Sequence, residues 1–330
     1  MRFFQLSLLL FLALILVVLF VLRMGKDSLL KGYIADAIFL ASDQIVVADS
    51  SGGLLHSNDG GRSWTEVAKN EIQVSEFFQD NNGRVWGYYF WPGIHEAGYV
   101  SLSYSDDMGR TWTSFEVDRE SRENIKLEIS PIAFILTESK QAMILSQEGQ
   151  LWINIATNGS WEETWKKIGV PNPEGEAFSG LEVNDNFYVS TSKNIWLSTD
   201  QGQTWNPSGE IGNPSLLTKN DNICWAVVTT GELLKNDCQD NEWIKEKSLA
   251  SLGVHNIFNF EAKNEKLLLA IESKANEAMG VIVDTKDMTE SIVKLKGSQA
   301  LSTGFTLNND FWFGAEGLFI YKEGELVQLL

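Results

Sequence analysis

One eight-residue pattern occurs three times in this sequence: SNDGGRSW at residues 57–64, SDDMGRTW at residues 105–112 and STDQGQTW at residues 198–205. Each copy follows a short apolar segment, at residues 53–56, 99–104 and 194–197, and each precedes residues that favour a strand. A polar, glycine-containing segment between two such runs predicts a turn that joins neighbouring strands. The pattern therefore indicates a repeated β-structure.

The residue types in the pattern are suited to closing a turn. The Asp side chain can accept hydrogen bonds from backbone N–H groups further along the chain, and the Gly can adopt a conformation that other residues resist. The Ser or Thr hydroxyl can tie the loop across, and the Trp can pack the hairpin against a neighbour. We therefore expect the residues of the pattern to hold each turn closed and to make no contact with a substrate. They are Ser57, Asp59, Gly61, Trp64, Ser105, Asp107, Gly109, Trp112, Ser198, Asp200, Gly202 and Trp205.

These segments resemble the Asp-box (BNR) repeats of sialidase-type β-propellers, sortilin-type receptors, xyloglucanases and the photosystem II assembly-factor propellers. In that family the box is a loop between the third and fourth strands of a blade. Three matches at the same place in a strand pattern are much more specific than one. The resemblance implies an all-β fold in which four-stranded blades form a closed ring.

Weaker repeats fill the rest of the sequence. Residues 151–168 keep a tryptophan anchor, Trp165, but have lost the Asp and Gly of the pattern, and residues 231–244 have Trp243 in the same place. Together with the three box tryptophans, the anchors are spaced by 48, 53, 40 and 38 residues, which is the period of propeller blades. Two further units fit after Trp243. We expect a single β-propeller over residues 32–330, most simply with seven four-stranded blades; six blades and an irregular first segment are the alternative.

Residues 1–31 differ in kind from the rest. Residues 6–22 read LSLLLFLALILVVLFVL, and with Phe3 and Phe4 this apolar stretch is long enough for a helix to cross the ~30 Å hydrocarbon layer. No small-residue cleavage pattern follows, so an uncleaved signal anchor is favoured over a cleaved signal peptide. Positive charges flank both ends and do not fix the orientation. We expect a single-pass membrane protein held through residues 3–22, with the propeller on the periplasmic or lumenal side.

The two cysteines, Cys224 and Cys238, flank a predicted hairpin turn at residues 230–232. A three-residue loop there would place Cys224 directly opposite Cys238, within reach of a disulfide. A two-residue loop would place Asp237 opposite and turn the two thiols to different faces. The sequence leaves both registers open; a disulfide would indicate an oxidising compartment.

Charge and arginine positions argue against several functions. A formal net charge of −18 leaves no basic stripe for nucleic acid. The sialidases that the boxes resemble need three arginines around a substrate carboxylate, whereas this chain has seven arginines and none after Arg122. The three histidines have no metal-ligand spacing, so neither a metal nor a cofactor is expected. A pair of glycosidase carboxylates stays possible, because many acidic residues could meet at the required distance.

One aromatic segment departs from the repeat. Residues 84–99 include six aromatic residues, and the connection at residues 91–98 is longer than a tight hairpin needs. Its aromatic side chains could simply line buried strand faces. Alternatively, the loop could carry a partner-binding or sugar-stacking patch on the face of the ring away from the boxes, with Tyr89, Trp91, Ile94 and His95 as the candidate binding residues.

These features favour a non-catalytic, membrane-tethered propeller that acts as a protein-binding or assembly and maturation scaffold. The assembly-factor propellers are similar in size, single-ring design and boxes, although this chain is more acidic and poorer in arginine. The alternative is a carbohydrate-active protein of the cell envelope, either a glycosidase or a lectin. The expected partners are the membrane and a protein, or else a glycan.

Overall fold

The computed structural model describes residues 32–69, 72–79, 83–91, 99–116, 131–136, 142–146, 151–154, 165–169, 177–208, 214–238, 242–297, 299 and 301–330. Apart from one short 3-10 turn at Ala250–Leu252, the regular structure in these ranges consists of β-strands. None of it includes a helix long and apolar enough to span a membrane. The signal anchor expected within residues 1–31 lies outside the described ranges.

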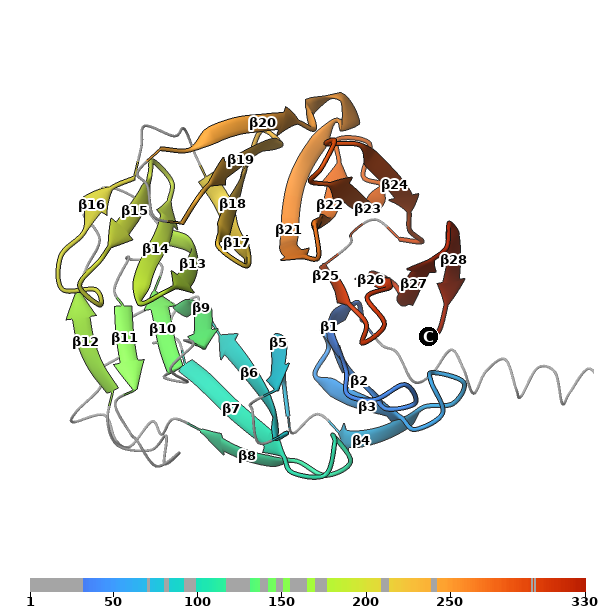
Figure 1. Cartoon of the computed structure of the whole chain (residues 1–330). Helices are drawn as coiled ribbons and strands as arrows, with labels where there is room; N and C mark the ends of the chain where they lie inside the picture. The colour runs from blue at the N-terminus through green and yellow to red at the C-terminus, as the bar shows by residue number, and fades with distance from the viewer. Residues whose placement is uncertain are drawn as a thin grey trace, which may run out of the picture.

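The described strands form seven four-stranded antiparallel sheets, and each sheet consists of four strands that are consecutive in the chain. The sheets are arranged as a ring around one axis (Figure 1). Their strands are β1 Ile34–Phe39, β2 Ile45–Asp49, β3 Gly53–Ser57, β4 Thr65–Lys69; β5 Glu76–Gln79, β6 Val85–Trp91, β7 Tyr99–Ser105, β8 Thr113–Glu116; β9 Pro131–Leu136, β10 Ala142–Ser146, β11 Leu151–Asn154, β12 Trp165–Gly169; β13 Ala177–Val183, β14 Asn186–Thr191, β15 Ile195–Ser198, β16 Asn206–Pro207; β17 Pro214–Asn220, β18 Ile223–Val228, β19 Glu232–Asn236, β20 Ile244–Ser248; β21 Val254–Lys263, β22 Lys266–Ser273, β23 Ala278–Asp284, β24 Glu290–Lys294; and β25 Ser302–Phe305, β26 Phe311–Gly314, β27 Leu318–Lys322, β28 Glu325–Gln328.

In each sheet the first strand lies nearest the axis and the fourth lies at the outer edge (Figure 1). Successive antiparallel strands reverse direction, so the first and third turns of a sheet lie at one end and the second turn at the other. The loops that contain the eight-residue pattern are third turns, between β3 and β4, β7 and β8, and β15 and β16. They therefore share one end of the ring, whereas β6 ends and β7 begins at the opposite end.

The core lies between adjacent sheets. The second strand of a sheet is covered on both faces, so it is apolar along its length; every residue of β2 is buried, as is all of β22 except Lys266. Outer strands are more exposed to solvent, and no residue of β28 is buried. Each of the main apolar clusters combines residues of two neighbouring sheets, for example Leu268 with Phe313 and Phe319. Burial of such side chains stabilises the seams by roughly 1.5–3 kcal/mol each.

The ring closes where the first sheet meets the last. The Ile34 N–H donates to the Ala315 carbonyl (2.9 Å), and the Ser302 hydroxyl donates to the Ile34 carbonyl (3.2 Å). Ile34, Ile45 and Leu55 of the first sheet pack with Trp312 and Leu318 of the last. Because neither sheet contributes a strand to the other, this closure depends on side-chain packing and a few hydrogen bonds. The arrangement is a β-propeller, as the repeats predict.

Candidate functional site

The three loops with the eight-residue pattern share one set of hydrogen bonds. In the first, the Ser57 hydroxyl oxygen accepts from the N–H groups of Asp59 (3.4 Å) and Gly61 (2.8 Å). The Asp59 carboxylate accepts from the Ser57 hydroxyl (2.9 Å) and from both the N–H (2.9 Å) and the hydroxyl (2.6 Å) of Ser63. The same bonds recur in the other two loops, at 2.6–3.4 Å. The Ser and Asp side chains together close each loop.

These bonds hold the three carboxylates in their charged form. Hydrogen bonds from Ser63 lower the pKa of Asp59 to about 2, and the equivalent bonds lower the pKa of Asp200 to about 2. At Asp107 burial raises the pKa, but hydrogen bonds led by those from Thr111 outweigh it, and the pKa falls to about 2. A carboxylate that accepts so many hydrogen bonds within its own loop stays ionised, so it is better suited to stabilising the loop than to transferring protons.

The glycines of these loops are required for two reasons. Gly61 and Gly109 have φ angles of 89° and 84°, in the left-handed region. In addition, a Cβ atom on Gly109 would lie 2.2 Å from the Val46 Cγ2 atom, and one on Gly61 would lie 2.8 Å from the Leu329 Cδ1 atom. Val46 belongs to the sheet before that of Gly109, and Leu329 to the sheet before that of Gly61 around the ring. Each of these two loops is therefore wedged against the preceding sheet.

In two of the repeats, the tryptophan at this position forms a hydrogen bond to the preceding sheet. The Trp64 indole N–H donates to the Leu329 carbonyl (3.2 Å), which directly follows the outer strand β28. Trp243, in the weaker repeat at residues 231–244, donates to the Ser208 hydroxyl (3.1 Å). Ser208 directly follows the outer strand β16. These bonds link adjacent sheets. The other two tryptophans of the eight-residue pattern donate within their own loops, Trp112 to the Gly109 carbonyl (3.0 Å) and Trp205 to the Gly202 carbonyl (3.1 Å).

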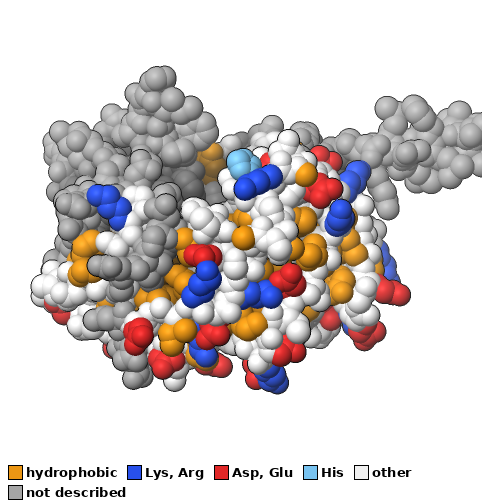
Figure 2. Space-filling model, turned by 90° about the horizontal axis from the view of Figure 1, so that it is seen from above, with side chains coloured by type: hydrophobic (Ala, Val, Ile, Leu, Met, Phe, Trp, Pro, Cys, Tyr) orange, Lys and Arg blue, Asp and Glu red, His pale blue; other side chains and the backbone are white. Residues whose placement is uncertain are grey.

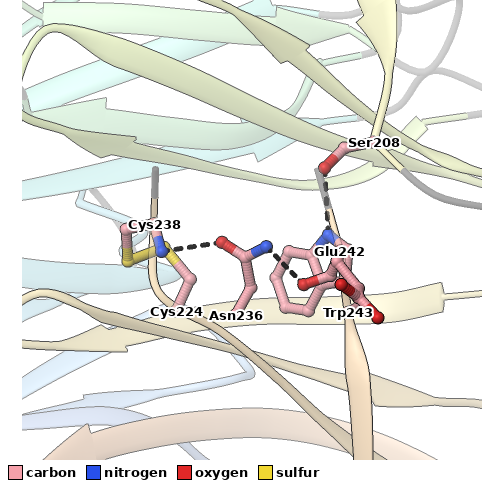
Figure 3. Close-up of a disulfide and its surroundings, with 6 residues drawn as sticks. All are labelled: Ser208, Cys224, Asn236, Cys238, Glu242 and Trp243. Atoms are coloured by element: carbon pink, nitrogen blue, oxygen red, sulfur yellow. Dashed lines mark hydrogen bonds between the residues drawn. A yellow bond between two sulfur atoms is a disulfide. The ribbon is translucent and has the colours of Figure 1, made fainter. Parts of the chain in front are cut away.

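The β17–β20 sheet, which includes Trp243's repeat, contains a disulfide between Cys224 and Cys238, whose Cα atoms are 5.2 Å apart (Figure 3). Both cysteines are fully buried. Asn236 lies beside them: its Oδ1 atom accepts from the Cys238 N–H (2.7 Å), and its Nδ2 atom donates to the Glu242 carbonyl (2.8 Å). The side chain of Asn236 thus spans the loop from its start to its end.

The hairpin register differs from both registers considered in the sequence. Cys224 lies opposite Asn236, not opposite Cys238 or Asp237. The loop between β18 and β19 does have three residues, but it starts one residue early, because Gly231 takes the left-handed position (φ 84°) at its end. Cys238 still reaches Cys224 because the chain bends after Asn236, with a φ of 56° at Cys238.

Three carboxyl groups on the innermost strands of three different sheets, Asp36, Glu76 and Glu261, interact electrostatically. Asp36 of β1 accepts from the Phe77 N–H of β5 (2.6 Å), and Glu76 accepts from the Tyr88 hydroxyl. Burial, and then the charge of Glu76, raises the pKa of Asp36. Crowding by protein atoms raises the pKa of Glu76, although its side chain still contacts solvent. Burial, and then the charge of Glu76, raises the pKa of Glu261 to about 8. No sequence signal pointed to this cluster.

The structure constrains the candidate binding residues only in part. Tyr89 lies half-buried in β6, next to buried Tyr88, and Trp86 is also buried, as expected if this strand is largely structural. Trp91 ends β6 and pairs with Tyr99. The side chain of Trp91 and the whole of Ile94 and His95 lie outside the described residues.

The outer edge of the ring has a mixed surface. On the side shown in Figure 2, hydrophobic patches are interrupted by acidic and basic side chains. Exposed apolar residues on the outermost strands include Ile244, Ile292 and Val327, and the Lys247–Glu290 ion pair (2.8 Å) bridges β20 and β24 among them. In the described part of the chain no three His, Cys, Asp or Glu side chains are placed to hold a metal ion.

Replacing Asp107 with asparagine is expected to lower the free energy of unfolding by about 1–2 kcal/mol, because charge-assisted bonds within the loop become weaker neutral ones. The pKa of this carboxyl is lower in the folded state than in the unfolded chain, so its contribution is present above about pH 4 and is lost as the pH falls towards 2. Urea titrations at pH 7 and pH 3 test this: the difference between wild type and variant should shrink at pH 3. Asp237→Asn, at an exposed carboxylate, is the control, and an equal effect from it would contradict the prediction.

No protein-family model matches the sequence, and no curated protein sequence matches it. Solved structures do. YCF48 from Cyanidioschyzon merolae superposes with a TM-score of 0.63 at 15% identity, covering 91% of this chain and 96% of that one. "YCF48 bound to D1 peptide" gives 0.60 at 13% identity, with 91% and 92% covered. The WD40 propeller domain of Doa1 gives 0.61 at 10% identity, with 89% and 93% covered. These similarities establish the β-propeller fold over almost the whole chain.

Proposed function

We propose that this protein is a non-catalytic scaffold that binds a protein partner during assembly or maturation, and that it is tethered to a membrane by residues 3–22. We further propose that its ring has seven blades and that the three loops are Asp boxes. The periplasmic or lumenal side of the membrane is the proposed location of the ring.

The observation that carries the binding proposal is the similarity in extent and shape to a propeller whose structure includes a bound peptide. That ring and this one match over nearly their full lengths, so both present one complete ring to a partner. The box residues argue in the same direction, because their acidic groups are occupied by hydrogen bonds within the loops. A closed ring with such loops offers surface for binding, and its repeated polar residues supply no catalytic group.

We place the partner at the end of the ring opposite the boxes. The strands β6 and β7 end and begin there, at Trp91 and Tyr99, and they are joined by the long connection that includes Ile94 and His95. Aromatic and aliphatic residues on such connections commonly anchor partners, because they bury a large area at a low entropic cost.

Photo-crosslinking of the tagged, membrane-embedded full chain, followed by mass spectrometry, tests this proposal. We expect protein adducts that disappear in the triple variant Trp91→Ala, Ile94→Ala, His95→Ala while the melting temperature is unchanged. The matched control is Arg62→Ala with Gln203→Ala, two exposed residues of the box loops at the other end of the ring, which should keep the adducts.

Three results would overturn the proposal. Unaltered crosslinking in the triple variant would remove the binding role of the β6–β7 connection, and so would loss of the fold in that variant. Specific binding to a glycan array without protein adducts would support the carbohydrate-active alternative instead.

A further inference from the structure

The loop between β19 and β20 occupies the position of an Asp box in its sheet. In the three boxes, the third strand ends at a serine seven positions before the tryptophan, and the fourth strand begins directly after that tryptophan. Here β19 ends at Asn236, seven positions before Trp243, and β20 begins at Ile244. By this alignment Asn236 stands where a box has its serine, and Cys238 stands where a box has its aspartate.

The side chains at these two positions use a different closing device. Asn236 keeps one function of the serine, since it accepts a hydrogen bond from the backbone N–H two residues on (2.7 Å). Cys238 cannot supply the carboxylate that accepts bonds from the far side of a box. It is instead bonded covalently to Cys224 on the adjacent strand β18. The loop is therefore anchored to the sheet by a sulfur–sulfur bond where the other loops close on themselves by hydrogen bonds.

This loop also holds a joint between two sheets. Trp243, which follows it, donates to Ser208 (3.1 Å) and meets the Tyr188 ring edge-on, with centroids 6.2 Å apart. Both partners belong to the preceding β13–β16 sheet: Tyr188 lies in β14, and Ser208 directly follows β16. The cysteines pack in the same cluster as Tyr188. The disulfide and Trp243 therefore lie at opposite ends of the β19–β20 loop (Figure 3), and both contact the cluster between the two sheets.

We propose that this disulfide makes the seam between the β13–β16 and β17–β20 sheets sensitive to reduction, so that a dithiol loosens this joint while the joints at the three boxes stay closed. In thiol–disulfide exchange the S–S bond breaks, each cysteine sulfur gains one electron and one proton, and the dithiol closes to its own disulfide. Both sulfurs are buried, so the loop must open for the dithiol to attack. Afterwards the Asn236 side chain still joins Cys238 to Glu242 by hydrogen bonds, but no covalent bond holds the loop, and Trp243 can leave Ser208 and Tyr188.

Hydrogen exchange of the full chain, with and without dithiothreitol, tests the proposal, and alkylation with mass spectrometry verifies reduction. We expect reduction to lower the melting temperature by about 5 °C, since a short closed loop is opened in a chain of this size. Exchange should accelerate in residues 232–248 and near Tyr188, and should be unchanged at residues 57–65, which include an Asp box of a sheet that does not form this seam.

The Cys224→Ser, Cys238→Ser double variant provides the second arm. It should show the fast exchange of the reduced protein under both conditions and no response to dithiothreitol. Two results would overturn the proposal: a native disulfide that resists dithiothreitol, or exchange in residues 232–248 that is the same in the oxidised protein, the reduced protein and the double variant.

Discussion

Replacing Gly109 with alanine is expected to lower the free energy of unfolding by about 3 kcal/mol, through two costs that add. The backbone φ of 84° is unfavourable for alanine, which accounts for about 1 kcal/mol. The larger cost is steric, because the new methyl group would lie 2.2 Å from the Val46 Cγ2 atom. Val46 is fully buried in β2 and can move only by disturbing its own sheet.

The change should be measured by urea unfolding at neutral pH, with Gly324→Ala as the matched control. Gly324 has nearly the same φ, 88°, but a Cβ atom there would meet nothing within 4 Å. We therefore expect the control to cost about 1 kcal/mol, the conformational part alone. Equal losses at the two glycines would show that the loop of Gly109 does not press on the preceding sheet, and would contradict the packing described for this loop.

Replacing Trp64 with alanine is expected to cost a similar amount, about 3 kcal/mol, because this side chain belongs to the seam that closes the ring. The indole packs on the cluster formed by the first and last sheets and donates to the Leu329 carbonyl (3.2 Å). The two sheets share no strand, so few other interactions replace it. Trp64→Phe, which keeps most of the packing and loses the hydrogen bond, should cost about 1 kcal/mol.

Hydrogen exchange should locate the damage. In Trp64→Ala, the amides of Ile34 and Leu329, which donate to Ala315 and Leu318, should exchange faster than those of sheets elsewhere in the ring. Trp205→Ala is the control, because the indole of Trp205 donates within its own loop and lies far from the closure. If both variants open the Ile34 seam equally, Trp64 has no special part in closing the ring.

The sequence of this protein determined its local structure and its repeat. A turn is set by a few neighbouring residues, so Ser57, Asp59 and Gly61 were enough to predict the loop, its hydrogen bonds and the strands on either side. Periodic tryptophans then predicted the ring, since each repeat needs a neighbour to cover its apolar faces.

The contacts between repeats were decided only by the tertiary structure. No local pattern could show that Gly109 abuts Val46 or that Trp64 bonds to Leu329, because these partners come from different repeats. The Asp36, Glu76 and Glu261 cluster was missed for the same reason. The register around Cys224 failed differently: the left-handed conformation of Gly231 moved the turn by one residue, and a shift of that size depends on how the whole hairpin packs. Turn chemistry acts within a few residues and can be read from sequence, whereas the packing that joins the sheets requires the closed ring.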